Sequence, residues 1–315
     1  MGYQSIYAID DLSEDIESRE LISPQVRTQA STAVFEIHEK TDLLKNIKKV
    51  EALKQIARDI IIEVVNLDYQ STTIDFPEIK SFDNYLYLHS VNVAVLGVIV
   101  GWKLGMKQSD LEDYALGAML HDIGKIDVSS DIIQKPGRLT GEEFEEVKKH
   151  SRNGFQRLSQ CSFLKPTSFS ISLQHHEAFD GTGYPAGRKG EEIHVFSRIA
   201  AIVDVFDALT TDRPYKKRWD FHRTLEYLRN DAVKKLDPKI LNVLLKLVPD
   251  YPRGTYIELS TGEHGLVISN QPHNIRDPKI RITTDAKGKP LPKDAIHEIA
   301  LGGQREIQIV SSIES

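Results

Sequence analysis

The spacing of histidine and aspartate residues is the feature that most limits how this chain can fold. Imidazole and carboxylate side chains recur at similar intervals, namely at His89, His121, Asp122, His150, His175, His176 and Asp204. The gaps of 32, 29, 25 and 28 residues each accommodate about one helix and one connection. Successive helices of a bundle can then direct these groups to one interior point, where they would suit zinc, iron, manganese or nickel. The spacing alone leaves ordinary surface or core histidines as the alternative.

A tight turn follows the second histidine pair. His175-His176-Glu177 leads into Asp180-Gly181-Thr182-Gly183-Tyr184-Pro185. The glycines permit positive φ angles and the proline lacks a backbone N–H, so no helix or strand can continue through this segment. We therefore expect a break between the helix that approaches the histidine pair and the helix that carries Asp204.

Two motifs together give the chain a family resemblance. The first is His121-Asp122-Ile123-Gly124-Lys125, and the second runs from His175 to Pro185. With Asp204–Thr210 and Arg213-Pro214-Tyr215, they resemble the HD-GYP family of bacterial cyclic di-GMP phosphodiesterases, within the HD superfamily of metal-dependent phosphohydrolases. The resemblance covers about residues 80–250, with a looser match on either side.

The resemblance implies a site for two divalent metal ions. The residues that match the family's ligands are His89, His121, Asp122, His150, His175, His176 and Asp204. Asp122 is the expected bridging ligand, because one carboxylate can serve two cations about 4 Å apart. Iron or manganese is favoured, with zinc or nickel as alternatives. Tyr85 stands where some members carry a glutamate and hold three metals, so we expect two here.

The resemblance also implies a reaction. A hydroxide shared by the two cations would attack phosphorus and expel the ribose 3′ oxygen, opening cyclic di-GMP to pGpG, and a second round can give GMP. Lys125 is expected to contact the phosphate or protonate the leaving group, and Asp83 to pair with Lys125. The simpler alternatives are a solvated lysine at a helix end and an acid at a helix N-terminus.

Substrate and partner contacts follow from the same resemblance. Lys189 matches a phosphate-binding position of the family, and Arg188 beside it is a second candidate. Tyr184 is expected at the lip of the pocket, and the Gly183-Tyr184-Pro185 turn is a candidate docking surface for diguanylate cyclase domains, although it is equally a simple turn. Tyr215 can stack on a guanine, but an aromatic residue after proline more often packs in a core.

Composition excludes several classes of protein. The 315 residues carry a formal charge of −6, which argues against DNA as a partner, and the single cysteine, Cys161, excludes an intramolecular disulfide. The longest apolar run, Val93–Val100, is too short to span a membrane, and no signal-peptide pattern opens the chain. We therefore expect a cytoplasmic protein.

The chain divides into three expected segments, and the expected fold class is mainly α. Residues 1–78 form a polar segment and a connector helix at about 36–66, which either packs on its own domain or forms a homodimer. Residues 79–250 form the HD-GYP catalytic bundle, around a buried helix at 84–104. Residues 251–315 form a small β-rich appendage, with strands expected at 255–259, 265–268, 280–283 and 306–310.

Four helix starts are expected from capping patterns. Ser109 with Glu112 and Thr140 with Glu143 fit capping boxes, while Ser197 and Asp237 fit simple N-caps. The histidines outside the ligand series, including His38, are interpreted as structural.

Two other functions remain open at this stage. The first is hydrolysis of a related nucleotide such as cyclic GMP-AMP or pGpG, because no residue pattern separates guanine from adenine recognition. The second is a receptor with little catalytic activity, which binds the nucleotide and signals through the 36–66 helix. The complete ligand series argues against a pure receptor, which has no need of seven metal ligands.

Overall fold

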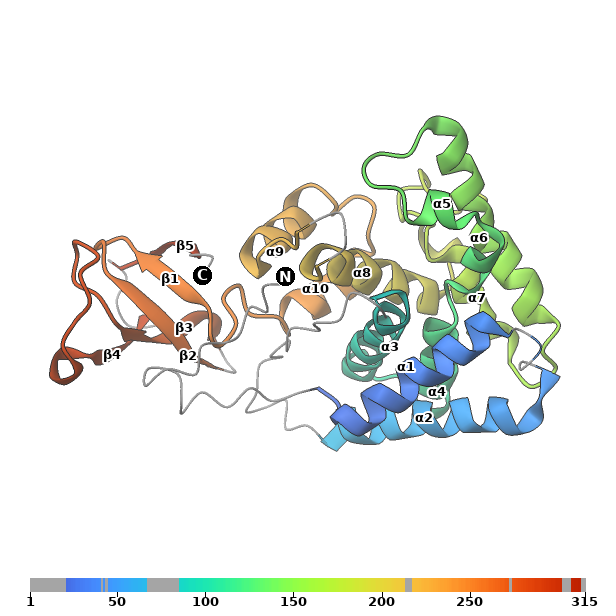
Figure 1. Cartoon of the computed structure of the whole chain (residues 1–315), viewed down its shortest axis with the longest axis horizontal. Coiled ribbons are helices and arrows are strands. Elements are labelled where there is room, and N and C mark those ends of the chain that lie inside the picture. Colours follow the sequence, from blue (N-terminus) through green and yellow to red (C-terminus); the bar gives the residue numbers. More distant parts are fainter. Residues whose placement is uncertain are drawn as a thin grey trace.

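The protein is a helical bundle joined to a small antiparallel sheet (Figure 1). The computed structural model describes residues 21–40, 42, 45–66, 85–212, 217–271, 274–301 and 307–312. Within this part the α-helices are α1 Pro24–Glu39, α2 Ile47–Asn66, α3 Tyr85–Lys103, α4 Gln108–Met119, α5 Ser130–Ile133, α6 Gly141–Ser159, α7 Pro166–Gln174, α8 Val195–Thr210, α9 Phe221–Asn230 and α10 Pro238–Leu245. Asp83 and Tyr215 lie outside the described residues.

Helix α3 is the centre of the bundle, as the sequence predicts. Its residues from Val91 to Val100 are all buried. Asn92 is the one polar side chain among them. Helices α4 and α8 pack along α3, and α1 and α2 cover another side of it. A helix that buries its whole circumference fixes the side chains that it carries, so His89 in its second turn has little freedom to move.

The N-terminal part contains two helices where one was expected. Helix α1 starts at Ser23, whose hydroxyl accepts from the Val26 amide, and Pro24 follows at the first helical position. Its buried residues Val26, Ala30, Val34 and Ile37 recur every three or four positions. The sequence predicted only a polar segment before the connector helix at about 36–66 and missed the helix over 24–35, because this polar helix buries only a narrow stripe.

Helix α2 packs on its own domain, the simpler of the two expectations. Its buried face runs from Val50 to Val64 and lies against α3 and α4, within the same apolar core as the rest of the bundle. A homodimer stays a prediction, as do the three domain boundaries. Among the described residues, no helix combines the length and the apolar character that a membrane span requires.

The predicted helix caps have mixed outcomes. Thr140 and Glu143 form a complete capping box, and Asp237 caps α10. Ser109 is not a cap, because α4 starts one residue after Lys107 and makes no side-chain capping bond. Ser197 is not a cap either, because α8 starts earlier, with His194 accepting from the Phe196 amide, while the buried Ser197 hydroxyl donates to Ser170.

The C-terminal sheet has five antiparallel strands in the order β4-β3-β2-β1-β5. The strands are β1 Tyr256–Leu259, β2 His264–Gln271, β3 Asn274–Ile282, β4 His297–Ala300 and β5 Ile309–Ser312. The sequence missed β4, whose side chains are mostly exposed. The sheet has its own small core, and Figure 1 places it at the opposite end of the molecule from α5, α6 and α7.

Candidate metal centre

The seven predicted ligands come together from five places in the bundle. His89 lies on α3, His150 on α6 and Asp204 on α8. The histidine pair His175-His176 begins at the C-cap of α7. The pair His121-Asp122 lies in a turn between α4 and a short 3-10 helix, η2 Ile123–Asp127.

Helix α4 ends at Met119, two residues before His121. The amides of Leu120 and His121 donate to carbonyls three residues back, which tightens the chain and ends the α-helix at Met119. Gly124 then lies against α6, where an added Cβ would overlap the carbonyl oxygen of His150. The glycine therefore permits the close contact that brings Asp122 beside His150.

The ligand atoms form two groups that suit a metal ion. His150, His175 and His176 make one group, and His89, His121 and Asp122 make the other. Within each group the candidate ligand atoms all lie within 4.8 Å of one another. Asp122 lies between the groups, with Oδ2 3.4 Å from His121 Nε2 and Oδ1 3.5 Å from His150 Nε2.

Backbone carbonyls set the tautomers of three of these histidines. The Nδ1 atoms of His121, His150 and His175 lie 2.7, 2.6 and 2.9 Å from the carbonyl oxygens of residues 118, 147 and 171. A carbonyl only accepts a hydrogen bond, so each Nδ1 carries the proton and each Nε2 presents a lone pair. This arrangement of a ring N–H on a carbonyl is typical of metal-binding histidines.

The lone pairs have few protein partners, the Ser151 hydroxyl at 3.5 Å from His150 Nε2 being the one side-chain donor found among the described residues. His150 Nε2 and His175 Nε2 face each other at 3.3 Å, where two acceptors repel unless a cation lies beside them. Among the described residues, His121 Nε2 and Asp122 Oδ1 are buried without a hydrogen bond. Buried polar atoms are normally paired, so this donor set fits a bound divalent cation.

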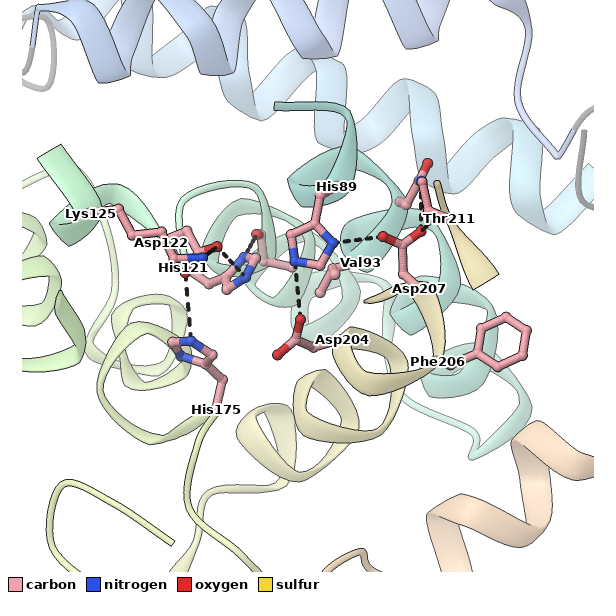
Figure 2. Close-up of polar contacts among 12 residues, drawn as sticks. His89, Val93, His121, Asp122, Lys125, His175, Asp204, Phe206, Asp207 and Thr211 are labelled. Atoms are coloured by element: carbon pink, nitrogen blue, oxygen red, sulfur yellow. Dashed lines mark hydrogen bonds and ion pairs between the residues drawn. The ribbon is translucent and has the colours of Figure 1, made fainter. Parts of the chain in front are cut away.

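Two aspartates hold His89 from opposite sides (Figure 2). Its Nε2 lies 3.0 Å from Asp204 Oδ1, and its Nδ1 lies 2.6 Å from Asp207 Oδ2. Burial favours neutral His89, but hydrogen bonds to the two carboxylates outweigh it and raise its pKa to about 9 in the metal-free protein. A cation that binds Nε2 must therefore displace a proton from His89.

Asp207 is a positioning residue that the sequence did not reveal. Its Oδ1 accepts from Asn92 Nδ2 at 2.7 Å and from the Thr211 hydroxyl at 3.2 Å, so both carboxylate oxygens are engaged. The sequence feature that could have indicated a role for Asp207 is its position one helical turn after Asp204. His89 and Asp207 are 118 residues apart, however, and only the folded bundle joins them.

Apart from His89, the predicted ligands are favoured as neutral imidazoles beside ionised carboxylates. Burial lowers the pKa values of His150 and His175, and lowers that of His176 to about 3. Burial would raise the pKa of Asp122, but the charges of neighbouring groups, His121 first and then Lys125, hold it well below its usual value. These are the protonation states that metal ligation requires.

Lys125 is part of the site. It lies on η2, and its Nζ is 2.5 Å from Asp122 Oδ2 with 23% of the side chain exposed. Figure 2 shows it beyond Asp122, on the side away from Asp204. The Lys125 ammonium is thus paired with a predicted ligand and is only partly exposed to solvent. Its role toward the substrate stays a prediction.

The Gly-Tyr-Pro turn folds back over the second histidine pair. The Tyr184 ring stacks on His176 with centroids 4.8 Å apart, and the Tyr184 amide donates to the His176 carbonyl at 3.1 Å. The buried Glu177 carboxylate accepts from the amides of Ala186 and Arg188 at 2.8 and 2.9 Å. Glu177, to which the sequence assigned no role, therefore anchors the segment that follows the turn.

The two predicted phosphate contacts have exposed side chains after this turn. The Arg188 guanidinium donates to the Glu192 carbonyl at 3.3 Å, so the structure does not direct it to the ligand cluster. Lys189 precedes the short 3-10 helix Gly190–Glu192, and its amide donates to the Glu192 carboxylate at 3.1 Å. Both residues stay predictions as substrate contacts.

His38 lies closer to the site than its sequence context suggested. It is buried on α1, its Nδ1 lies 2.9 Å from the Val34 carbonyl, and its Nε2 has no hydrogen bond among the described residues. Burial lowers its pKa, and the charges of Asp122 and Lys125 also act on it. The N-terminal helix therefore contributes an imidazole to the surroundings of the site.

Comparison with known proteins identifies the central bundle. The profile of the HD domain family matches residues 84–240. A cyclic di-GMP phosphodiesterase of Pseudomonas aeruginosa is 33% identical over 255 residues, which are 79% of this chain and 61% of that protein. The cyclic di-GMP phosphodiesterase response regulator RpfG of Xanthomonas campestris is 39% identical over 150 residues, 47% of this chain and 39% of that protein.

Two further matches extend the comparison. A 3′3′-cGAMP-specific phosphodiesterase of Vibrio cholerae is 36% identical over 165 residues, 51% of this chain and 36% of that protein. The crystallised HDG"Y"P protein of Bdellovibrio bacteriovorus shares the fold with a TM-score of 0.57, at 20% identity over 73% of each chain. The chain spans less than two thirds of the length of these curated relatives.

Proposed function

Because the chain belongs to the HD-GYP family of the HD superfamily, we propose that it is a phosphodiesterase that hydrolyses cyclic di-GMP to pGpG, with GMP as a further product. The observation that carries the proposal is the convergence of imidazole Nε2 atoms on Asp122, where His121 Nε2 and Asp122 Oδ1 are buried without a hydrogen bond among the described residues. A receptor that only binds a nucleotide has no need of such a donor set.

The proposed cofactor is a pair of divalent cations, with iron or manganese favoured over zinc or nickel. His150, His175 and His176 would hold one cation, and His89, His121 and Asp204 the other, with Asp122 between them. When bound, such cations lower the pKa of water and neutralise charge on a phosphoryl group.

The chain's own residues would position the substrate and move protons. Lys125 Nζ, which pairs with Asp122 in the metal-free protein, would hold a phosphate oxygen or protonate the leaving 3′ oxygen. Arg188 and Lys189 would approach the second phosphate from the exposed segment after the turn. Tyr184, stacked on His176, would form the lip of the pocket.

The experiment is turnover of cyclic di-GMP by protein reconstituted anaerobically with Fe(II), Mn(II) or Zn(II), followed by chromatography over time. We expect pGpG to appear with at least one metal, and Asp122→Ala to lose both metal and product. Tight binding of cyclic di-GMP without product in every metal would replace the proposal with a receptor function. Docking of diguanylate cyclase domains on the Gly183-Tyr184-Pro185 turn, and a cytoplasmic location, are further proposals.

A second substrate is supported by the likeness to the Vibrio cholerae enzyme named for 3′3′-cGAMP. The test is competition between equal concentrations of cyclic di-GMP and 3′3′-cGAMP in one reaction. Faster loss of cyclic di-GMP supports the main proposal, and faster loss of 3′3′-cGAMP replaces it.

A further inference from the structure

An exposed aromatic ring on α6 lies beside the Gly-Tyr-Pro turn and has no role in the site described above. Phe144 leaves 46% of its surface open to solvent, although it occupies the first turn of a helix whose other end packs firmly. Its ring meets that of Tyr184 edge to face, with centroids 6.1 Å apart and planes at 84°. A single exposed apolar side chain is common on protein surfaces, so the groups around Phe144 indicate whether it has a role.

A cation lies over the same pair of rings. Lys148, one turn further along α6, places Nζ 5.1 Å from the Phe144 centroid and 5.7 Å from the Tyr184 centroid. Its ion pair with Glu145 lies at the surface, where 69% of the Glu145 side chain is exposed. Exposed ion pairs contribute little in water, so an incoming anion can compete for this ammonium.

The rings form a continuous path from the ligand cluster to the surface. His176 stacks on Tyr184, and Tyr184 meets Phe144, so Phe144 is two ring contacts from a predicted metal ligand. A phosphodiester held at the metal centre would therefore have one of its nucleosides directed along this path.

We propose that Phe144 and Lys148 form a nucleobase subsite, in which the exposed Phe144 ring stacks on one base and Lys148 binds an adjacent phosphate oxygen. This inference rests on the proposed function and adds to it the residues that bind the part of the substrate farther from the reacting phosphorus. A cyclic dinucleotide offers both a flat base and a second anionic phosphate. Stacking accepts any base, so this subsite gives affinity for cyclic dinucleotides without choosing guanine over adenine.

The competing explanation is packing alone. In that case Phe144 supports Tyr184, much as Arg152 supports the turn by donating to the Pro185 carbonyl at 3.1 Å. Loss of the ring would then disturb His176 and reduce turnover of every phosphodiester equally. The two explanations differ in whether the loss depends on the presence of bases.

The test compares cyclic di-GMP with bis(p-nitrophenyl) phosphate, a small diester without bases, on the metal-reconstituted full chain. For Phe144→Ala we expect kcat/KM on cyclic di-GMP to fall about 5- to 150-fold more than on the small diester, through KM. Phe144→Trp should restore it. Lys148→Gln should raise KM for cyclic di-GMP, whereas Lys149→Gln should not, although Lys149 pairs with Glu146 in the same way on the same helix.

Equal losses of kcat/KM on both substrates for Phe144→Ala would overturn the subsite in favour of packing. An unchanged kcat/KM on both substrates would overturn both explanations. Wild-type turnover tests the proposed function separately. If the wild-type chain hydrolyses only the small diester, calorimetric titration with cyclic di-GMP makes the same comparison. Weaker binding of cyclic di-GMP by Phe144→Ala than by the wild type then supports the subsite. Equal binding by the two proteins, or no binding by the wild type, rejects it.

Discussion

Replacing Asp207 with asparagine tests whether the metal centre depends on a residue that would not itself touch the metal. Asp207 accepts hydrogen bonds on both carboxylate oxygens, from His89 Nδ1 at 2.6 Å and from Asn92 Nδ2 at 2.7 Å. An amide at this position has one accepting atom and one donating group, so one of these donors would meet another donor. The change keeps the size of the side chain and removes its charge.

The expected effect is weaker metal binding by the folded protein. Loss of a hydrogen-bond partner of a metal-binding histidine lowers metal affinity by about 10- to 100-fold, or about 1.4–2.7 kcal/mol. The pKa of His89 in the metal-free protein should also fall, because one of the two carboxylates that oppose the effect of burial is lost.

The assay is titration of metal-free protein with Mn(II) or Zn(II) against a chelator of known affinity, with the pKa of His89 measured by NMR. Asp231→Asn is the matched control, because Asp231 is exposed at the end of α9. A folded Asp207→Asn protein with wild-type metal affinity would refute the argument that Asp207 positions a metal ligand.

Three further changes have outcomes set by the structure. Glu177→Gln should destabilise the fold by about 1–3 kcal/mol in thermal denaturation, because two amides lose a charged acceptor; an unchanged Tm contradicts this. Gly124→Ala should lower both stability and metal content, because its Cβ overlaps the His150 carbonyl oxygen, whereas Gly141→Ala has open space and should not. In the metal-free protein, His176 alone should lower stability by up to about 1.4 kcal/mol per unit as pH falls from 6.5, because its pKa is about 3 when folded and the unfolded chain binds the proton first. His176→Gln should make this slope in urea denaturation shallower, and an unchanged slope would contradict the assignment.

The parts of the fold with strong local signals were predictable from the sequence. Helix α3 is apolar nearly all round, which predicts a central buried helix, and Thr140 with Glu143 predicts the start of α6. Helix α1 escaped detection because its apolar stripe is narrow and most of its surface is polar. The Ser197 cap failed because a histidine side chain three residues earlier, His194, took the capping role.

The residues of the candidate site likewise differ in how far the sequence predicts them. The clustering of the predicted ligands could be anticipated from their regular spacing, and the structure brings these side chains together, while their role as metal ligands stays a prediction. Asp207 and His38 were not predictable, because their proximity to the site depends on packing between helices far apart in sequence. The exposure of Phe144 was equally hidden, since an apolar residue in a helix is normally expected in the core.

The most direct measurement is stepwise addition of Fe(II) or Mn(II) to metal-free protein under anaerobic conditions, with bound metal and pGpG formation measured in the same samples. The proposed mechanism predicts no product without metal and full turnover of cyclic di-GMP when two metal ions are bound per chain. Asp122→Ala should stay inactive throughout the titration. Equal turnover by the metal-free protein, or by Asp122→Ala, would contradict a reaction at this metal centre.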